Sequence, residues 1–293
     1  MREVQECVGC GSKRLRSYKA NLSPFLAEMV HLVPRSRVRF VRCRSCGLLF
    51  YDPRMTDEEI ALLYEDYRGK RYQSVRQKHE PWYTPEMNEC VGNDADTLRE
   101  RKETLFSVLA ENTDVNAIHR ILDYGGDQGQ FISDQLADRE RFVYDISGVP
   151  TLPGIKSVDA AQGFPNDLDL IMCCHVLEHV SFPKEILERL RALGNEGTLY
   201  YFELPFDSPM KSRRTGLSKK LFGILTRSST FVNVNNKMRG FSFSMHEHQN
   251  YFDEASLREF LERNGFGVQV IKRTTVPTLG IRAEIICCLA KKK

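Results

Sequence analysis

From about residue 96 onward, the chain alternates short apolar runs with stretches in which apolar residues recur at helical spacing. One helical face carries Leu98, Leu105, Val108 and Leu109. A second helix is predicted over about 183–193, where a glycine follows its last turn. The strand-like runs are 121–123, 141–144, 155–158, 168–174, a run that ends at Pro205, 268–272 and 282–289. Alternating strands and helices predict an α/β fold built on a parallel sheet.

The first of these strands ends on Asp123 and leads into a glycine-rich turn. Gly125 and Gly126 permit a sharp turn and a close approach of the backbone to a ligand. Gly129 would let a following helix pack closely on the strand. That helix is expected to bury Phe131, Ile132 and Leu136. Because Asp123 and Asp127 would repel phosphate at the helix N-terminus, the turn suits a ligand that carries an ammonium group and hydroxyls.

Another acid follows the second strand, about twenty residues beyond the glycine turn. This residue is Asp145. In nucleotide-binding βαβ units, an acid at this place holds the hydroxyls of a ribose. The carboxyl ends of parallel strands share one edge of the sheet, where ligands of open α/β folds bind. The sequence therefore predicts a nucleoside site at that edge.

The N-terminal residues contain two Cys-x-x-Cys pairs, and five further cysteines are scattered along the chain. The pairs are Cys7 with Cys10 and Cys43 with Cys46. In a cytosolic chain, this spacing indicates a tetrahedral zinc site, with redox-active or buried thiols as the alternatives. Residues 1–52 are therefore interpreted as a zinc-ribbon module, and the other five cysteines as small core residues. The module is rich in Lys and Arg, so it either binds nucleic acid or is a solvated structural ribbon.

Composition narrows the class of protein. The 293 residues carry a net charge of +3, which is too small to imply a polyanionic partner by itself. No apolar run reaches the roughly 20 residues that span a bilayer. The first residues lack a signal-peptide core, so a cytoplasmic location is expected.

Two segments lie outside the predicted sheet. Residues 53–95 form a connector, in which Thr56 and Glu59 make a capping box and the aromatic stretch 64–83 is expected to be a loop that covers a site or packs on the core. Residues 207–245 form a basic insertion in the domain 96–293. Three interpretations remain open for it: a lid over a phosphorylated substrate, a membrane-contacting amphipathic patch at 216–226, or a solvated excursion.

Together these motifs resemble a known family. Asp-x-Gly-Gly-Asp-x-Gly is similar to motif I of class I S-adenosylmethionine-dependent methyltransferases, and Asp145 matches motif II. His175-Val-Leu-Glu-His179 resembles motif IV. The full order, with the Cys pairs and His246-Glu-His248-x-x-Tyr-Phe252, resembles zinc-ribbon methyltransferases of sugar and surface-glycan biosynthesis. The resemblance implies a Rossmann-like methyltransferase sheet with an N-terminal zinc ribbon.

The resemblance also implies roles for individual residues. The cofactor S-adenosylmethionine would be bound by Asp123, Gly125, Asp127, Gly129, Asp145, Asp159 and His175, with Asp159 near the adenine. His248 is nominated as the general base, assisted by Glu247, and His179 is second choice. The alternative for both histidines is structural hydrogen bonding. A zinc site at His175 and His179 is disfavoured, because the sequence lacks the His-Glu-x-x-His order and shows no third ligand nearby.

We therefore expect methyl transfer to a small acceptor that is sugar-like or phosphorylated. The related sugar C-methyltransferases have a tyrosine where this chain has Met245, so the methylated atom stays open. The alternative is a nucleic-acid-binding protein whose methyltransferase core modifies nucleic acid or is inactive. The chain has no Asn-Pro-Pro-Tyr-like or Pro-Cys motif of base methyltransferases, which makes nucleic acid the less favoured partner.

Overall fold

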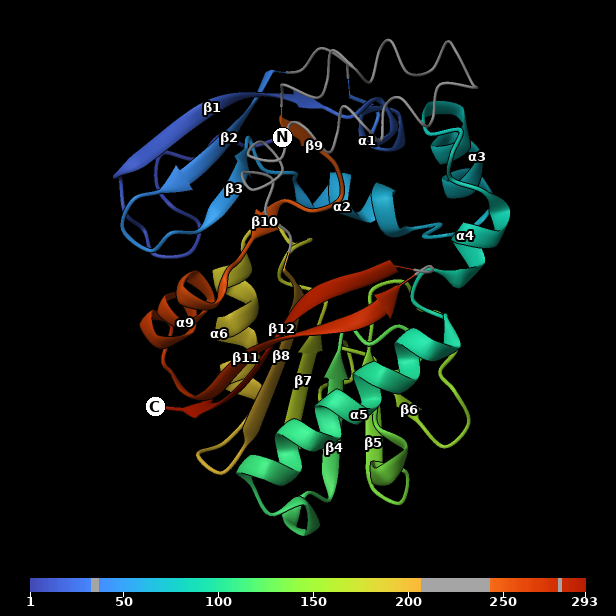
Figure 1. Cartoon of the computed structure of the whole chain (residues 1–293), viewed down its shortest axis with the longest axis vertical. Helices are drawn as coiled ribbons and strands as arrows, with labels where there is room; N and C mark the ends of the chain where they lie inside the picture. Colours follow the sequence, from blue (N-terminus) through green and yellow to red (C-terminus); the bar gives the residue numbers. More distant parts are fainter. Residues whose placement is uncertain (33–36, 207–242, 279–280) are drawn as a thin grey trace.

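A seven-stranded sheet forms the lower half of the molecule in the computed structural model, which describes residues 1–32, 37–206, 243–278 and 281–293 (Figure 1). Five neighbouring strands, β8, β7, β4, β5 and β6, run parallel, whereas β12 is antiparallel to β8 and to β11. The spatial order is β11 (Phe266–Thr278), β12 (Ile281–Lys292), β8 (Leu199–Pro205), β7 (Leu170–Cys174), β4 (Arg120–Tyr124), β5 (Glu140–Tyr144) and β6 (Lys156–Ser157). The predicted α/β fold is confirmed.

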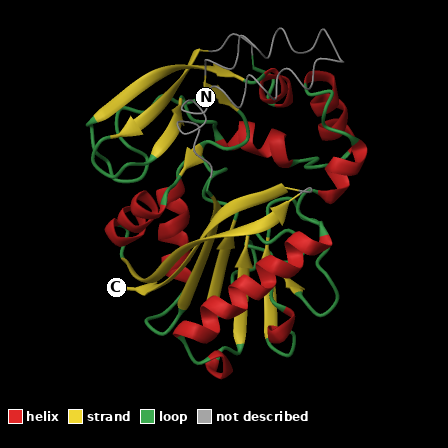
Figure 2. Ribbon diagram, in the orientation of Figure 1, coloured by secondary structure: helices red, strands yellow, loops and turns green. Residues whose placement is uncertain are grey.

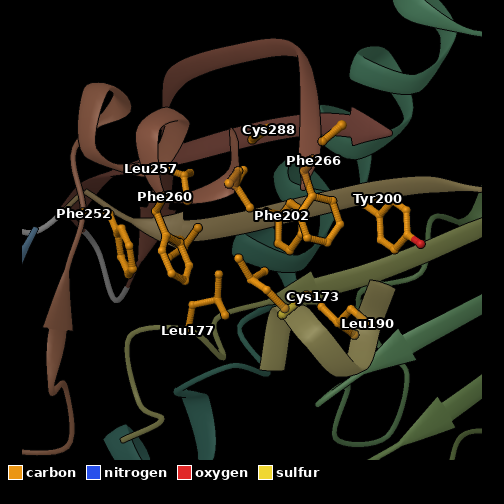
Figure 3. Close-up of a cluster of buried hydrophobic side chains, with 14 of the residues drawn as sticks. Cys173, Leu177, Leu190, Tyr200, Phe202, Phe252, Leu257, Phe260, Phe266 and Cys288 are labelled. Atoms are coloured by element: carbon orange, nitrogen blue, oxygen red, sulfur yellow. The ribbon is translucent and has the colours of Figure 1, made fainter. Parts of the chain in front are cut away.

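Helices cover both faces of this sheet (Figure 2). Since side chains alternate along a strand, Leu170 and Met172 of β7 pack with α5 (Ala95–Asn112), whereas Ile171 and Cys173 face the other way. That second face is covered by α6 (Pro183–Leu193) and α9 (Glu254–Arg263), whose Leu190 and Phe260 pack with Phe202 of β8 (Figure 3). The predicted helix over 183–193 is confirmed. Four of the five scattered cysteines are buried as expected, but Cys90 is exposed.

The expected helix after the glycine turn does not form. Ile132 and Leu136 are buried, but residues 125–139 make successive turns and one short 3-10 helix, Asp134–Leu136. Asp127 and Gly129 have left-handed φ of 52° and 84°, so an α-helix cannot begin before residue 130. A second short 3-10 helix, Val115–Ala117, precedes β4.

A smaller sheet stands above the first one, and it combines strands from the N-terminal part of the chain with two strands from residues 243–251 (Figure 1). Its inner strands come from the cysteine-rich N-terminus, whereas its two outer strands follow residues 207–242, which lie outside the described residues. The order is β10 (Asn250–Tyr251), β3 (Leu49–Asp52), β2 (Arg37–Cys43), β1 (Leu15–Leu22) and β9 (Phe243–Met245). The last three residues of the basic insertion therefore form a strand, while the proposed lid and the patch 216–226 lie outside the described residues.

The connector 53–95 begins with the helix predicted at Thr56, and a further helix replaces part of the loop expected over 64–83. It contains α2 (Asp57–Tyr64), α3 (Lys70–His79) and α4 (Pro85–Cys90), and α1 (Pro24–Met29) packs beside α3. The capping box of Thr56 and Glu59 is confirmed at the start of α2. The loop expected over 64–83 is wrong, because α3 occupies part of this stretch. The helix could not be recognised from the sequence, since Tyr72 is the only fully buried residue of α3 and apolar periodicity is almost absent.

One buried arginine joins the two sheets. Arg54, 0% exposed, donates from its guanidinium to the carbonyl oxygens of Tyr51, Val180, Ser181 and Gln249 and to Oδ1 of Asn250, over 2.7–3.1 Å. Burial lowers the pKa of Arg54 to about 9, so the side chain stays charged at neutral pH. These bonds fix the segment after β3, the segment after β7 and the segment between β9 and β10 against one another.

Candidate active site

The glycine turn brings an uncompensated carboxylate to the carboxyl edge of the large sheet. Asp123, at 0% exposure, has no hydrogen-bond partner on either carboxylate oxygen among the described residues. A Cβ on Gly126 would lie 2.4 Å from its carboxyl carbon, so this position requires glycine. Gly125, with φ of 76°, donates its N–H to the carbonyl of Tyr144 at 2.7 Å. Burial raises the pKa of Asp123 to about 7, which means that its charge is costly in the free protein.

The carboxylate of Asp145 holds the glycine turn against the end of β5. Its Oδ2 accepts from the N–H of Asp127 at 2.9 Å, and its Oδ1 accepts from the N–H and hydroxyl of Ser147 at 2.8 and 2.6 Å. Asp127 in turn accepts from the side-chain amide of Gln130 at 2.9 Å. Asp159 is exposed beyond β6 and accepts from the N–H of Ala161. The structure thus brings Asp123, Asp127 and Asp145 to one turn and leaves Asp159 at its periphery.

His175 follows β7 in a left-handed conformation, with φ of 56°, and lies between two buried carboxylates. Its Nδ1 is 3.1 Å from Oε1 of Glu178, and its Nε2 is 3.3 Å from Oε1 of Glu203. Burial and the charge of Arg101 oppose the protonated form of His175, but the neighbouring carboxylates of Glu178 and Glu203 outweigh them and raise the pKa of His175 above its usual value. Both nitrogens of a protonated imidazole are donors, so the charged form of His175 has no lone pair for a metal ion.

Sequence reasoning missed Arg101. This residue of α5 is 6% exposed, donates from Nε to Glu203 and lies over the ring of Phe131, with Cζ 3.6 Å from the ring centroid. Its Nη2 has no hydrogen-bond partner among the described residues. A signal was available, because Arg101 shares the buried helical face with Leu105 and Val108 and an arginine on such a face needs a carboxylate partner.

The three proposed catalytic residues are brought near one another, but they do not form one hydrogen-bonded chain. The rings of His179 and His248 are 4.6 Å apart, and the ring of Tyr64 lies 6.3 Å from that of His179. Burial, together with His179, lowers the pKa of His248 to about 3. Glu247 accepts instead from the hydroxyl of Tyr72 at 2.6 Å and from Nη1 of Arg76 at 3.2 Å, both on α3. Glu247 therefore attaches the connector to the loop that carries His248.

The four paired cysteines converge at the end of the small sheet. Their sulfur atoms all lie within 4.8 Å of one another, and Cys7–Cys46 and Cys10–Cys43 are each 3.6 Å apart. Backbone N–H groups of Gly9 and Ser45 point at the sulfurs of Cys7 and Cys43, both at 3.4 Å. Four thiolates around zinc at about 2.3 Å would be about 3.8 Å apart in a tetrahedron, so the cluster is compatible with a zinc-binding module.

Comparisons with known proteins agree with this architecture. A model of the methyltransferase domain family matches residues 95–270. No curated protein sequence matches the chain. Solved structures with similar folds include magnesium protoporphyrin IX methyltransferase from Synechocystis PCC 6803 with bound SAM (15% identity, 83% of this chain and 100% of that chain, TM-score 0.41). Others are an S-adenosylmethionine-dependent methyltransferase from Clostridium acetobutylicum (12%, 74% and 98%, 0.43) and the mitomycin 7-O-methyltransferase MmcR (13%, 74% and 60%, 0.40).

Residues 95–270 contain the whole parallel part of the large sheet, its glycine turn and the acids at the strand ends. Among the described residues, no helix is long and apolar enough to cross a membrane. Because the family model spans more than half of the 293 residues, this chain belongs to the methyltransferase domain family and is an enzyme of that class.

Proposed function

We propose that this methyltransferase transfers the methyl group of S-adenosylmethionine to a small, sugar-like or phosphorylated acceptor in sugar or glycan biosynthesis. The observation that carries the choice of donor is the buried carboxylate of Asp123, which has no hydrogen-bond partner in the described chain and lies at the glycine turn. A methionine ammonium would compensate that charge, whereas a phosphate would be repelled by it and by Asp127. The sugar-like acceptor rests on the order of motifs.

Different residues at the edge of the sheet would bind different parts of S-adenosylmethionine. Asp145 would accept the two ribose hydroxyls, Gly125 and Gly129 would let the backbone approach, and Asp159 would lie toward the adenine. His175 would help to shape the methionine end through Glu178 and Glu203, which enclose it. Isothermal calorimetry with S-adenosylmethionine tests the assignment. Absence of heat, combined with salt-sensitive binding of DNA or RNA, would favour the nucleic-acid alternative instead.

We expect Asp145→Ala to weaken the binding of S-adenosylmethionine by at least about 10-fold, since each 1.4 kcal/mol is a factor of ten and two hydroxyl contacts are lost. The substitution also releases the glycine turn, because Asp145 accepts from the N–H of Asp127. Calorimetry measures the affinity, and circular dichroism checks the fold. Asp138→Ala, at an exposed carboxylate just before β5, is the matched control. Equal affinities for both variants would refute the role of Asp145.

Asp123→Asn should change stability and donor binding in opposite directions. Burial raises the pKa of Asp123 to about 7 in the folded state, whereas in the unfolded chain the carboxyl group has its ordinary pKa of 3.8. Wild-type stability therefore falls between pH 4 and 7, by at most about 4 kcal/mol, and the penalty is constant above that. The Tm advantage of the variant should grow over this interval, while its affinity for the donor drops. A Tm difference that does not vary with pH would contradict the assignment.

The methyl acceptor would lie where Tyr64, His179 and His248 meet. In the proposed reaction, an acceptor hydroxyl oxygen forms a bond to the methyl carbon while the carbon–sulfur bond breaks and leaves S-adenosylhomocysteine. The hydroxyl proton passes to His248, with His179 as the second candidate. Glu247 assists by holding the His248 loop against Tyr72 and Arg76. In-line alignment of the reacting atoms at about 3 Å supplies most of the rate enhancement.

The four thiolates would hold a structural zinc ion, with residues 1–52 as the zinc-ribbon module and 53–95 as the connector that covers the site. Sulfur separations of 3.6 Å and the N–H groups aimed at Cys7 and Cys43 support this assignment. Paired cysteines that serve as zinc ligands and not as disulfides fit the reducing cytoplasmic location expected for this chain. A closed set of four protein ligands leaves no position for a substrate, so the ion would stabilise the small sheet and take no part in methyl transfer.

A further inference from the structure

A second cluster of metal-binding side chains lies at the proposed acceptor position. One ligand atom each from Glu178, His179 and His248 lies within 4.8 Å of the others. The Nε2 atom of His179 is 3.9 Å from Oε1 of Glu178. The sequence shows two of these residues side by side and the third about seventy positions later, which is why no third ligand could be identified from spacing alone.

The carboxylate of Glu178 lacks the partners that a buried charge needs. The residue is 2% exposed, and neither oxygen accepts a hydrogen bond in the described part of the chain. Its charged neighbours are the imidazoles of His175 and His179, with nitrogen–oxygen distances of 3.1 and 3.9 Å. A buried carboxylate that depends on two imidazoles for its compensation would be stabilised further by a bound cation.

The backbone around the cluster is held in place by hydrogen bonds between its two segments. The N–H of Gln249 donates to the carbonyl of Glu178 at 2.7 Å, and its side-chain amide donates to the carbonyl of His179 at 2.6 Å. Asn250 donates to the carbonyl of Leu177 at 2.8 Å. A ligand set fixed in this way by its backbone is preorganised, as metal sites require.

We propose that Glu178, His179 and His248 bind a divalent transition-metal ion. Two imidazoles and one carboxylate are a common ligand set for zinc and its neighbours in the first transition row. Two atoms bound to one ion at about 2.1 Å can be about 4.2 Å apart at most. The three ligand atoms lie within 4.8 Å of one another, so small side-chain rotations would bring them to this range. Three protein ligands leave coordination positions open, in contrast to the four thiolates of the ribbon.

The open positions would take an oxygen of the acceptor, so the ligand class is a hydroxyl-bearing molecule. The ion would hold this oxygen and make its hydroxyl more acidic. His248 would then be a ligand and not the base, and the released proton would pass to solvent water. Binding of the ion does not depend on methyl transfer. The two proposals can therefore fail separately.

Equilibrium dialysis of the full chain against Zn²⁺, with metal counted by mass spectrometry, tests the site. We expect two zinc ions in the wild-type protein and one in Glu178→Gln and His248→Gln, with affinity for the second ion at least about 10-fold weaker in each variant. His119→Gln, an exposed histidine at the amino end of β4, should keep both ions. Circular dichroism shows whether each variant is folded.

Two results would overturn the proposal. One is a wild-type protein that holds a single zinc ion and keeps it in the folded Glu178→Gln and His248→Gln variants. The other is a folded Glu178→Gln or His248→Gln variant that still holds two ions with wild-type affinity. Calorimetry with S-adenosylmethionine, run on the same samples, reports on the donor site independently.

Discussion

We expect Arg54→Met to lower the free energy of unfolding by about 5 kcal/mol. The guanidinium donates to five acceptors in three segments of the chain, and methionine can donate to none of them. Each buried acceptor that is left without a donor costs about 1–3 kcal/mol. Some are shared, since the carbonyl of Val180 also accepts from Asn250, so the expected loss is smaller than five full penalties.

Urea denaturation followed by circular dichroism measures this loss. Arg54→Lys retains a charge but has fewer donors, so it should fall between the wild type and Arg54→Met. Arg99→Met is the matched control, because Arg99 makes only an exposed ion pair with Asp96 and should change stability by less than about 1 kcal/mol. If Arg54→Met lies within that same range, the two sheets are not held together by this side chain.

Cys43→Ser is expected to abolish binding of the proposed zinc ion and to unfold the small sheet. Cys43 is the last residue of β2 and one of the four clustered cysteines, so its loss would leave the proposed site with three thiolates. Structural zinc contributes about 10–16 kcal/mol to the folding of small zinc modules, more than a sheet of this size gains from burial. The effect should extend to the strands β9 and β10, and so to the loop that carries His248.

Metal content and amide hydrogen exchange measure this outcome. Exchange protection should be lost in β1 to β3 and kept in β4, β7 and β8 of the large sheet. Cys90→Ser, at an exposed cysteine outside the cluster, should match the wild type in both measurements. A Cys43→Ser protein that retains its zinc and its protection would show that the thiolates are not the source of stability.

The large sheet could be predicted because its signals are local. Apolar runs of five to seven residues, a glycine turn and a helix at 183–193 that begins with proline and is followed by glycine each follow from neighbouring residues in the sequence. The missing helix after the glycine turn could not be foreseen, because left-handed φ at Asp127 depends on its hydrogen bonds to Asp145 and Gln130. The helix α3 escaped detection because polar side chains, not an apolar stripe, attach it to its neighbours.

Pairings between distant residues limited the prediction of the site. Sequence motifs identified Asp123, Asp145, His175 and His248, but not their partners. Arg101 lies 102 positions before Glu203, and Tyr72 lies 175 positions before Glu247. Such contacts leave no periodic trace in the chain, because they are set by the packing of whole elements. Glu178 was visible within a motif, yet only its burial without partners distinguishes it from a structural carboxylate.

The pairing of β1 with β9 has a consequence for the order of events at the ribosome. Ala20 to Leu22 lie beside Phe243 to Met245, so one edge of the small sheet stays open until most of the polypeptide has been translated. The four clustered cysteines lie within the first 46 residues, so the proposed ion could bind early in translation. The β1 edge of the nascent sheet would then stay unpaired until the last fifth of the protein, which contains β9, has been synthesised.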